Sequence, residues 1–408
     1  MIKIEVSQQR KDEYWNTVGQ ALTDEIGRYL KVIDQLKGGK VIDGDPGLAP
    51  LKNIAVNIIN LAANPKKTPA EFAPAHYANG MANYLKDVKK VSDSVLDNMT
   101  KFFSFLLDNQ GKELKELLLC EPDHLFGKHT KLSGAYPITG GHEQKIFDMV
   151  FNFVDCGRVV TPIKAFFRKK PELVFVCPYC NLHPVTYVPG ANGRTAEVHE
   201  LDHFYEKKGH PLLSYSLCNL VPSCHACNAP YNKGQQKVSD QYYVNPYHRG
   251  YVAALRFKPI EINNVIFNLE LDTLVPKSDP LYWQMRGRHD VIDGSNKSGN
   301  LNLLQIMSRY NHVDVIKDAK RYYKTFTDHA RSRRRMITFF KRMGRDISEP
   351  VHKAWYAETM PAKFDQADFH EDENAKLCRD LHDHVFLRDS HPFNSDVRKI
   401  IKNNALAD

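Results

Sequence analysis

The chain has 408 residues, of which 42% are hydrophobic and 25% are charged, and its formal net charge at pH 7 is +8. A chain of this length can form two or three domains, or one core extended at both ends, with apolar residues enough for a large buried core. No secretory signal precedes the first charged residues, and no apolar run is long enough to span a bilayer. We therefore expect a cytoplasmic protein, neither secreted nor membrane-spanning, whose mild basic excess favours polyanionic partners.

The first 170 residues are dominated by helical periodicity. Apolar residues recur at helical spacing between residues 8 and 36, and Gly38-Gly39 ends that pattern. The run Phe102–Leu107 is expected to lie in the core. Further helices are predicted over 50–63, 70–91, 93–119 and 142–169, with a linker at 121–141. Residues 1–170 are thus predicted to be a helical N-terminal region that serves partner docking or regulation.

The pattern changes at Pro171, where short β-type runs replace the helices. Strands are predicted at 173–176, 185–188, 196–201 and 219–222, followed by a helix from Cys224. Residues 171–250 are therefore predicted to form a separate small module.

Residues 251–408 are predicted to be a mainly helical C-terminal region. Two short strands open it, at 255–257 and 265–269, and a helical stretch at 298–345 ends in basic residues. The pair His382 and His384 fits no ligand set and is predicted to lie on the surface. The expected fold class is α+β, with the small module embedded between two mainly helical regions.

Two Cys-x-x-Cys pairs stand out among the eight cysteines, Cys177/Cys180 and Cys224/Cys227. In a reducing compartment this spacing indicates metal or redox chemistry instead of disulfides. Four thiolates suit a tetrahedral zinc ion with a structural role, since no position stays open for water. A zinc ion would join the two ends of a module that has little apolar area of its own.

Two alternatives bear on these cysteines. The Cys-Pro-Tyr-Cys run also looks like a glutaredoxin active site, but a redox motif needs a helix that begins at its first cysteine. Pro184 and nearby β-branched residues disfavour such a helix, and the second pair has no redox explanation. The zinc interpretation is therefore favoured, and three thiolates with His183 or His225 remain a variant of it.

A second constellation lies between the cysteine pairs: Asp202-His203, Asn219 and Asn228. Asp202 supplies a carboxylate of the kind that Mg²⁺ prefers, and Asn228 can add a neutral carbonyl oxygen. A histidine with a pKa near neutrality can take a proton from water for in-line attack on phosphorus. Asn219, both donor and acceptor, is suited to fixing the loop that orients His203.

In this order the residues resemble the HNH nucleases of the ββα-metal class, in the variant with Asn in place of the last His. The resemblance covers about residues 172–250. It implies a zinc-stapled ββα-metal module in which the cysteines are structural zinc ligands. It further implies His203 as general base, Asp202 and Asn228 as ligands of Mg²⁺ or Mn²⁺, and Asn219 as the loop-orienting residue.

Basic residues are predicted to contact substrate phosphates. Members of the HNH family usually carry a lysine three residues after the last Asn, whereas this chain has Tyr231 there and a lysine two residues later. The predicted substrate-binding residues are Lys207, Lys208, Lys233, Arg333 and Arg334.

A finer resemblance involves Asp202-His-Phe, Pro211-Leu-Leu-Ser, Asn219-Leu-Val-Pro-Ser-Cys and Asn245-Pro-Tyr247. These runs look similar to HNH effectors of Septu-type and retron-associated anti-phage systems. That likeness implies a partner ATPase that holds the nuclease in check, with DNA or tRNA as the target.

The sequence thus predicts an HNH endonuclease that hydrolyses phosphodiester bonds of nucleic acid, DNA in preference, and leaves a 5′-phosphate. It is expected to serve antiviral defence. The alternative is a noncatalytic zinc-stabilised adaptor that binds nucleic acid or protein, because an isolated Asp-His pair also occurs by chance.

Overall fold

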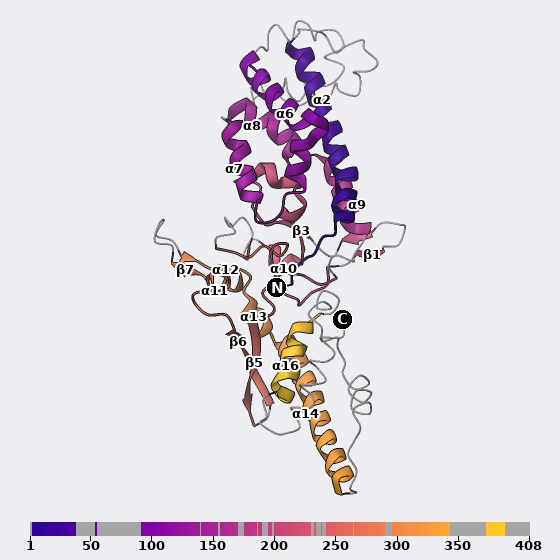
Figure 1. Ribbon diagram of the computed structural model, residues 1–408, viewed down its shortest axis with the longest axis vertical. Helices are drawn as coiled ribbons and strands as arrows, with labels where there is room; N and C mark the ends of the chain where they lie inside the picture. The colour runs from indigo at the N-terminus through magenta and orange to yellow at the C-terminus, as the bar shows by residue number, and fades with distance from the viewer. Residues whose placement is uncertain are drawn as a thin grey trace. The chain divides into compact units, whose positions relative to one another are not determined.

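The computed structural model divides into two compact units, each described separately below (Figure 1). The helical unit comprises Val6–Lys170 and His203–Leu220, and the cysteine unit comprises Met1–Glu5, Pro171–Asp202 and Val221–Asp408. The predicted module 171–250 is therefore shared between them. The structure describes residues 2–37, 54, 91–138, 140–153, 156–169, 175–185, 187–189, 195–197, 200–229, 232–233, 238, 242–263, 265–289, 296–342 and 373–387.

The helical unit is built from helices that pack side by side around an aromatic core. Its helices are α1 (Gln8–Tyr14), the π-helical turn η1 (Trp15–Gly19), α2 (Gln20–Lys37), α6 (Asp93–Leu118), α7 (Leu125–Ala135), α8 (Gly141–Phe151), α9 (Gly157–Lys169) and the 3₁₀ turns η6 (Pro211–Tyr215) and η7 (Leu217–Asn219). Ser7 and Ser92 cap α1 and α6, since each hydroxyl accepts a backbone N–H of the first turn. The predicted helices at 50–63 and 70–91 lie outside the described residues, apart from Ile54.

The core of this unit lies between α6, α8 and η6. Phe102, Phe103 and Leu106 are buried, so the predicted core position of residues 102–107 is confirmed for these three. Phe147 and Phe151 stack with ring centroids 4.7 Å apart. Tyr215 of η6 donates a hydrogen bond to the Val150 carbonyl at 2.9 Å, which fixes residues 203–220 on this helical core.

Three predicted elements of the helical unit differ in the structure. The linker prediction at 121–141 was wrong, because α7 occupies its centre. Gly127 and Gly134 both lie inside that helix, where a Cβ would meet nothing within 4 Å, so neither marks a turn. The predicted helix 142–169 is two helices, and α6 contains a non-helical break at Asp108–Gly111.

The cysteine unit contains short antiparallel sheets and further helices. Three described strand pairs are antiparallel: β1 (Tyr187–Pro189) with β2 (Thr195–Glu197), β5 (Leu255–Ile262) with β6 (Val265–Thr273), and β7 (Arg288–His289) with β8 (Asn296–Lys297). A fourth pair, β3 (Glu200–His203) with β4 (Leu220–Ser223), includes two residues of the helical unit, His203 and Leu220. The helices of the cysteine unit are α10 (His225–Asn228), α11 (Pro280–Arg286), α12 (Gly299–Leu303), α13 (Ile306–Tyr310), α14 (Val313–Arg342) and α16 (Ala375–Leu387). The predicted helical stretch 298–345 is thus three helices, with Gln305 in a left-handed conformation before α13.

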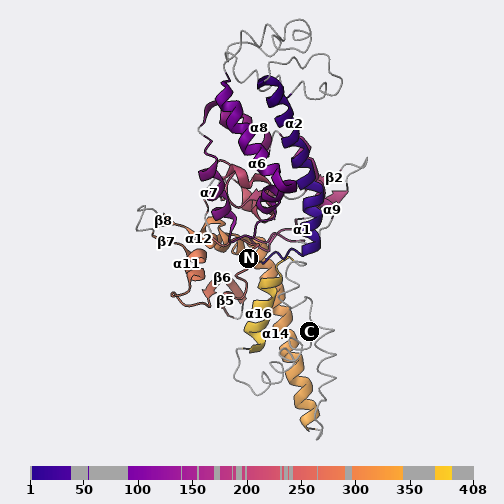
Figure 2. The ribbon, with the colours of Figure 1, turned by 45° about the horizontal axis from the view of Figure 1, so that its top comes forward.

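The β5–β6 hairpin is covered by α14 and α16, which lie side by side in Figures 1 and 2. Asp380 of α16 accepts a hydrogen bond from the Phe257 backbone N–H at 2.7 Å. His382 is 1% exposed and meets Phe326 edge-on, so the predicted surface position of His382 was wrong. The cause is the packing of α16 on α14, which cannot be predicted from the sequence of α16 alone.

The mixture of helices with small antiparallel sheets confirms the expected α+β class at that level. Within the described part of the chain, no helix combines the length and the apolarity needed to cross a membrane.

Candidate functional site

The four paired cysteines form a single buried cluster in the cysteine unit. The sulfurs of Cys177, Cys180, Cys224 and Cys227 all lie within 4.8 Å of one another, and the Cys180 and Cys224 sulfurs are 3.9 Å apart. Sulfurs about 2.3 Å from a central zinc ion have tetrahedral edges of about 3.8 Å. The cluster therefore fits one zinc ion held by four thiolates, which agrees with the predicted ligand set.

Two tight turns bring the cysteines together. In the first, the Asn181 backbone N–H donates to the Cys177 carbonyl at 2.8 Å, and Asn181 has a φ of 56°. Asparagine tolerates this left-handed conformation better than most residues do. In the second, Cys224 stands before the first turn of α10 and Cys227 lies within it. Among the described residues this cluster contains no histidine, and His225 contacts Glu200 instead.

Arg309 of α13 faces the cluster. Its Nη1 lies 2.8 Å from the Cys227 sulfur, and its Nη2 lies 3.5 Å from that of Cys180 and 3.6 Å from that of Cys224. Hydrogen bonds with the other cysteines, and in addition with Arg309, lower the pKa of the Cys224 thiol. Nothing in the sequence pointed to this residue.

Asp202, the predicted ligand of a catalytic cation, is buried in the cysteine unit with both carboxylate oxygens bonded. Tyr179 donates to Oδ2 at 2.6 Å, and Lys233 forms an ion pair with Oδ1 at 2.8 Å. Burial, and then the adjacent Asp202, raise the pKa of Tyr179 well above its usual value, so its hydroxyl remains a donor. The position of Lys233 therefore matches a structural partner of Asp202 more closely than a solvent-facing phosphate contact.

Asn228 belongs to a trio in the same unit in which Asn228 and Glu200 are half-buried and His225 is exposed. Its Nδ2 donates to Glu200 Oε2 at 2.7 Å, and His225 Nδ1 lies 2.6 Å from Glu200 Oε1. The hydrogen bond to Glu200 raises the pKa of His225. Because its Nδ2 is engaged, the amide of Asn228 has a fixed orientation, and its Oδ1 is the atom that could bind a cation.

His203, the predicted general base, is described within the helical unit. It is 8% exposed, its Nε2 lies 2.9 Å from the Ser214 carbonyl, and the Phe153 ring meets it edge-on at 4.8 Å. A carbonyl oxygen only accepts, so Nε2 carries the proton in this contact and the neutral ring has its lone pair on Nδ1. The loop thereby selects one tautomer.

Asn219 fixes this same loop from inside the helical unit. Its Oδ1 accepts the Tyr205 backbone N–H at 2.7 Å, and its Nδ2 donates to the carbonyls of Leu213 at 2.9 Å and Tyr205 at 3.3 Å. Asn219 is fully buried. One side chain thus ties the residues that follow His203 to the segment that carries Ser214.

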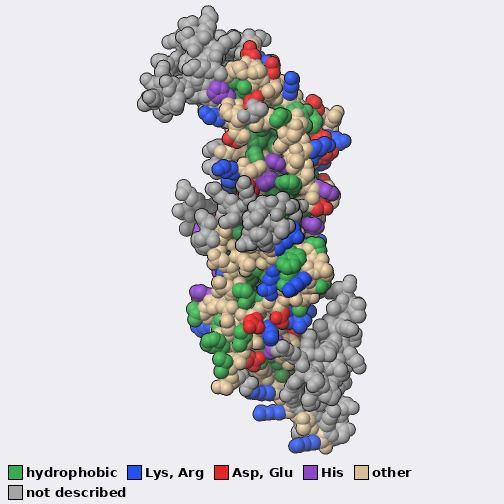
Figure 3. All heavy atoms as spheres, turned by 90° about the vertical axis from the view of Figure 1, so that its left-hand side faces the viewer, with side chains coloured by type: hydrophobic (Ala, Val, Ile, Leu, Met, Phe, Trp, Pro, Cys, Tyr) green, Lys and Arg blue, Asp and Glu red, His purple; other side chains and the backbone are tan. Residues whose placement is uncertain are grey.

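The predicted phosphate-binding residues belong to both units, Lys207 and Lys208 to the helical unit and the other three to the cysteine unit. Lys207 Nζ lies 5.8 Å above the Phe153 ring, and Lys208 is exposed. Arg333 and Arg334 lie on α14, but their side chains are outside the described residues. Figure 3 shows Lys and Arg side chains at the lower end of the view, where Figure 1 places the end of α14.

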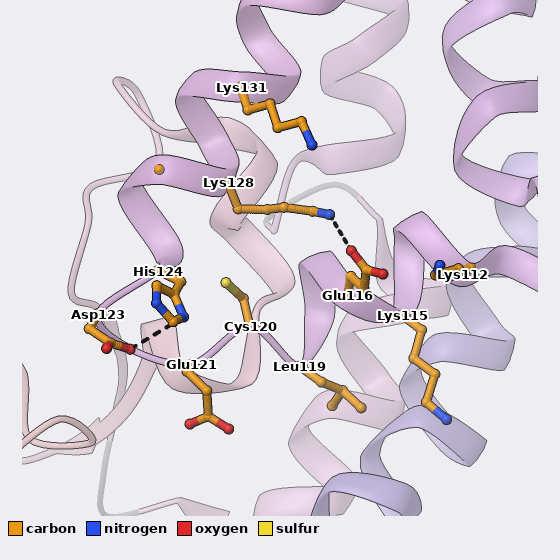
Figure 4. Close-up of a pocket in the computed structure, with 11 residues that line it drawn as sticks. Lys112, Lys115, Glu116, Leu119, Cys120, Glu121, Asp123, His124, Lys128 and Lys131 are labelled. Atoms are coloured by element: carbon orange, nitrogen blue, oxygen red, sulfur yellow. Dashed lines mark hydrogen bonds and ion pairs between the residues drawn. The ribbon is translucent and has the colours of Figure 1, made fainter.

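A separate pocket of about 680 Å³ opens between α6 and α7 in the helical unit (Figure 4). One of its lysines, Lys128, forms an ion pair with Glu116 of the same pocket at 2.7 Å. Burial raises the pKa of the Cys120 thiol to about 11, which disfavours a thiolate nucleophile. The pocket therefore adds no reactive group to the predicted site.

Comparison with known proteins finds no matching family model, no matching curated protein and no matching solved structure.

Proposed function

We propose that this chain is a metal-dependent HNH endonuclease with a structural zinc centre. The observation that carries the proposal is the His203 loop, in which Asn219 makes three buried hydrogen bonds and the Ser214 carbonyl selects the histidine tautomer. A histidine kept in one tautomer by a rigid loop is what a general base requires.

The proposed chemistry begins at Nδ1 of His203. This nitrogen takes a proton from a water molecule, and the resulting hydroxide attacks phosphorus in line with the leaving 3′ oxygen, which yields a 5′-phosphate. A bound Mg²⁺ or Mn²⁺ would stabilise charge on the phosphorane and on the departing oxygen. Asp202 and Asn228 are the residues proposed to hold it, through oxygen atoms that hard cations prefer.

Chain connectivity supports joint action of the base and the metal ligand. Asp202 and His203 are joined by a peptide bond, so their Cα atoms are about 3.8 Å apart whatever the arrangement of the two units. Successive side chains of a strand point to opposite faces. The two can reach one phosphate because β3 ends at His203, where the chain passes into a loop.

One observation favours a second candidate, a noncatalytic zinc-stabilised adaptor. Both oxygens of Asp202 are already bonded, to Tyr179 and to Lys233, and the side chain is 3% exposed. A catalytic cation would have to exchange with one of these partners. If Asp202 has only a structural role, the zinc centre remains and the hydrolytic chemistry does not.

The test is cleavage of plasmid DNA and of a tRNA pool, with Mg²⁺ or Mn²⁺, by the wild type and by His203→Ala. His124→Ala is the matched control, since that histidine is exposed in the same unit. The nuclease proposal expects cutting by wild type and control only, and the favoured polymer identifies the substrate. Equal cutting by His203→Ala would reject the site.

The role in antiviral defence and the regulatory ATPase are part of the same proposal. If the chain cuts only as part of a complex that the ATPase regulates, cleavage is absent with the isolated chain and appears when the ATPase subunit and ATP are added. Inactivity of wild type under both conditions, with zinc bound, would favour the adaptor.

A further inference from the structure

The guanidinium of Arg309 contacts three of the four cluster sulfurs, although it lies 82 residues beyond Cys227 and 129 beyond Cys180 in sequence. Both terminal nitrogens take part, Nη1 towards Cys227 and Nη2 towards Cys180 and Cys224. Such a fork is the geometry in which arginine serves several acceptors at once. The contact therefore does not resemble a chance approach of a surface side chain.

The contact places the positive charge of Arg309 beside a cluster that is negatively charged when zinc is bound. Four thiolates and one Zn²⁺ carry a net charge of about −2, because each coordinating thiol is deprotonated. The four cysteines are at most 5% exposed, and charge buried without a partner is costly. A guanidinium is not deprotonated in proteins, so Arg309 brings a full positive charge to the sulfurs. One guanidinium would offset half of that excess.

The residues that follow hold Arg309 in place. Tyr310 donates to the Cys180 carbonyl at 2.7 Å. Asn311 bonds both backbone groups of Leu269 in β6, accepting at 2.7 Å and donating at 3.0 Å. Three consecutive residues thus bind the cluster sulfurs, the first cysteine turn and the β5–β6 hairpin.

We propose that Arg309 is a positioning residue of the metal centre, one that tightens zinc binding by neutralising and orienting the thiolates. The metal-binding structure then extends to residues 306–311 of the C-terminal region, well beyond residue 250. This inference rests on the zinc centre of the proposed function and not on its nuclease chemistry.

The experiment measures zinc affinity of the full chain by competition with a chelator of known affinity. Arg309→Met keeps the apolar stem and removes charge and donors, and Arg309→Lys keeps the charge but not the fork. Arg321→Met is the matched control, because Arg321 is exposed on α14 and pairs with Asp318. Loss of an outer-sphere partner typically lowers metal affinity about 10- to 100-fold. We expect that loss for Arg309→Met, a smaller one for Arg309→Lys and none for Arg321→Met.

A second readout is the absorption spectrum of the Co²⁺-substituted protein, whose thiolate-to-metal bands should shift in Arg309→Met and not in the control. Unchanged affinity and unchanged spectrum in Arg309→Met would overturn the proposal. If Arg309→Met does not fold, the zinc affinities of Arg309→Gln and Arg309→Lys are measured in its place. Wild-type zinc affinity in both of these variants would also overturn the proposal. A wild type that binds no zinc would instead reject the metal centre of the proposed function, which is a different failure.

Discussion

Lys233 Nζ lies 2.8 Å from Asp202 Oδ1, and the two side chains of this ion pair are 2% and 3% exposed. The other carboxylate oxygen accepts a hydrogen bond from Tyr179. The residue proposed to hold a catalytic cation therefore already has a cationic partner in its own chain. A divalent ion and the Lys233 ammonium would compete for the same carboxylate, which makes the pair central to both candidate functions.

Replacement of Lys233 by Met should destabilise the protein strongly. It leaves the Asp202 carboxylate buried, with the Tyr179 hydroxyl still donating to it but without its cationic partner. Loss of one partner of a buried pair costs about 3–5 kcal/mol. Urea unfolding followed by circular dichroism measures the change. Lys208→Met, at an exposed position, should leave the unfolding midpoint unchanged.

The double variant Asp202→Asn with Lys233→Met separates charge from packing. Removal of both charges should recover part of the lost stability, because no uncompensated ion stays buried. If the stability lost in the double variant equals the sum of the losses in Asp202→Asn and Lys233→Met, the two side chains do not interact and the ion pair does not form.

Asn219→Asp should disturb the His203 loop while retaining its size. The carboxylate still accepts the Tyr205 N–H, but both hydrogen bonds to carbonyls are lost and negative charge then faces the Leu213 and Tyr205 oxygens. Each lost hydrogen bond costs about 1 kcal/mol, and a buried unsatisfied group adds about 1–3 kcal/mol. Thermal unfolding measures the stability, and NMR of the His203 ring nitrogens reports the tautomer. A ring that keeps its proton on Nε2 would show that the loop orients His203 without Asn219.

The cysteine cluster was predictable because each cysteine pair shows itself in a short stretch of sequence. Each Cys-x-x-Cys spacing fits one tight turn, and the chemistry of zinc demands that the two turns meet. The hydrogen-bonding capacity of Asn219 was likewise visible from its residue type. Side chains that act at these positions from afar, such as Arg309 and Tyr179, have no spacing signal, since tertiary packing alone brings them there.

The misjudged elements have a similar cause. The Gly-bearing stretch 121–141 was taken as a linker, yet Gly127 and Gly134 lie inside α7. Each glycine costs a helix about 1 kcal/mol relative to alanine, which packing of the helix can outweigh. His382 was assigned to the surface because it fits no ligand set in the sequence, whereas α16 buries it against Phe326. Local propensity is a weak guide wherever a neighbouring element decides burial.

Zinc should bind at one ion per chain and depend on the paired cysteines. Cys177→Ser removes one of four ligands, so elemental analysis should find most of the zinc lost and the protein sensitive to chelators. Cys120→Ser is the control, because Cys120 lies outside the cluster. Equal zinc content in both variants would contradict the four-cysteine centre.

Stability should fall below neutral pH through His129 of the helical unit. Burial, and then the neighbouring His210, lower the pKa of His129 from 6.5 to about 4, while Glu206 acts in the opposite direction. Between these two values the unfolded chain binds a proton that the folded chain does not, so the free energy of unfolding rises with pH across that window. The contribution of the neutral His129 to the free energy of unfolding is fully present above pH 6.5. It is lost progressively as the pH falls towards about 4. We expect His129→Gln to reduce the difference between urea midpoints measured at about pH 7 and about pH 5. His124→Gln, at an exposed position of the same unit, should retain the wild-type difference, and equal behaviour of the two variants would exclude His129 as its source.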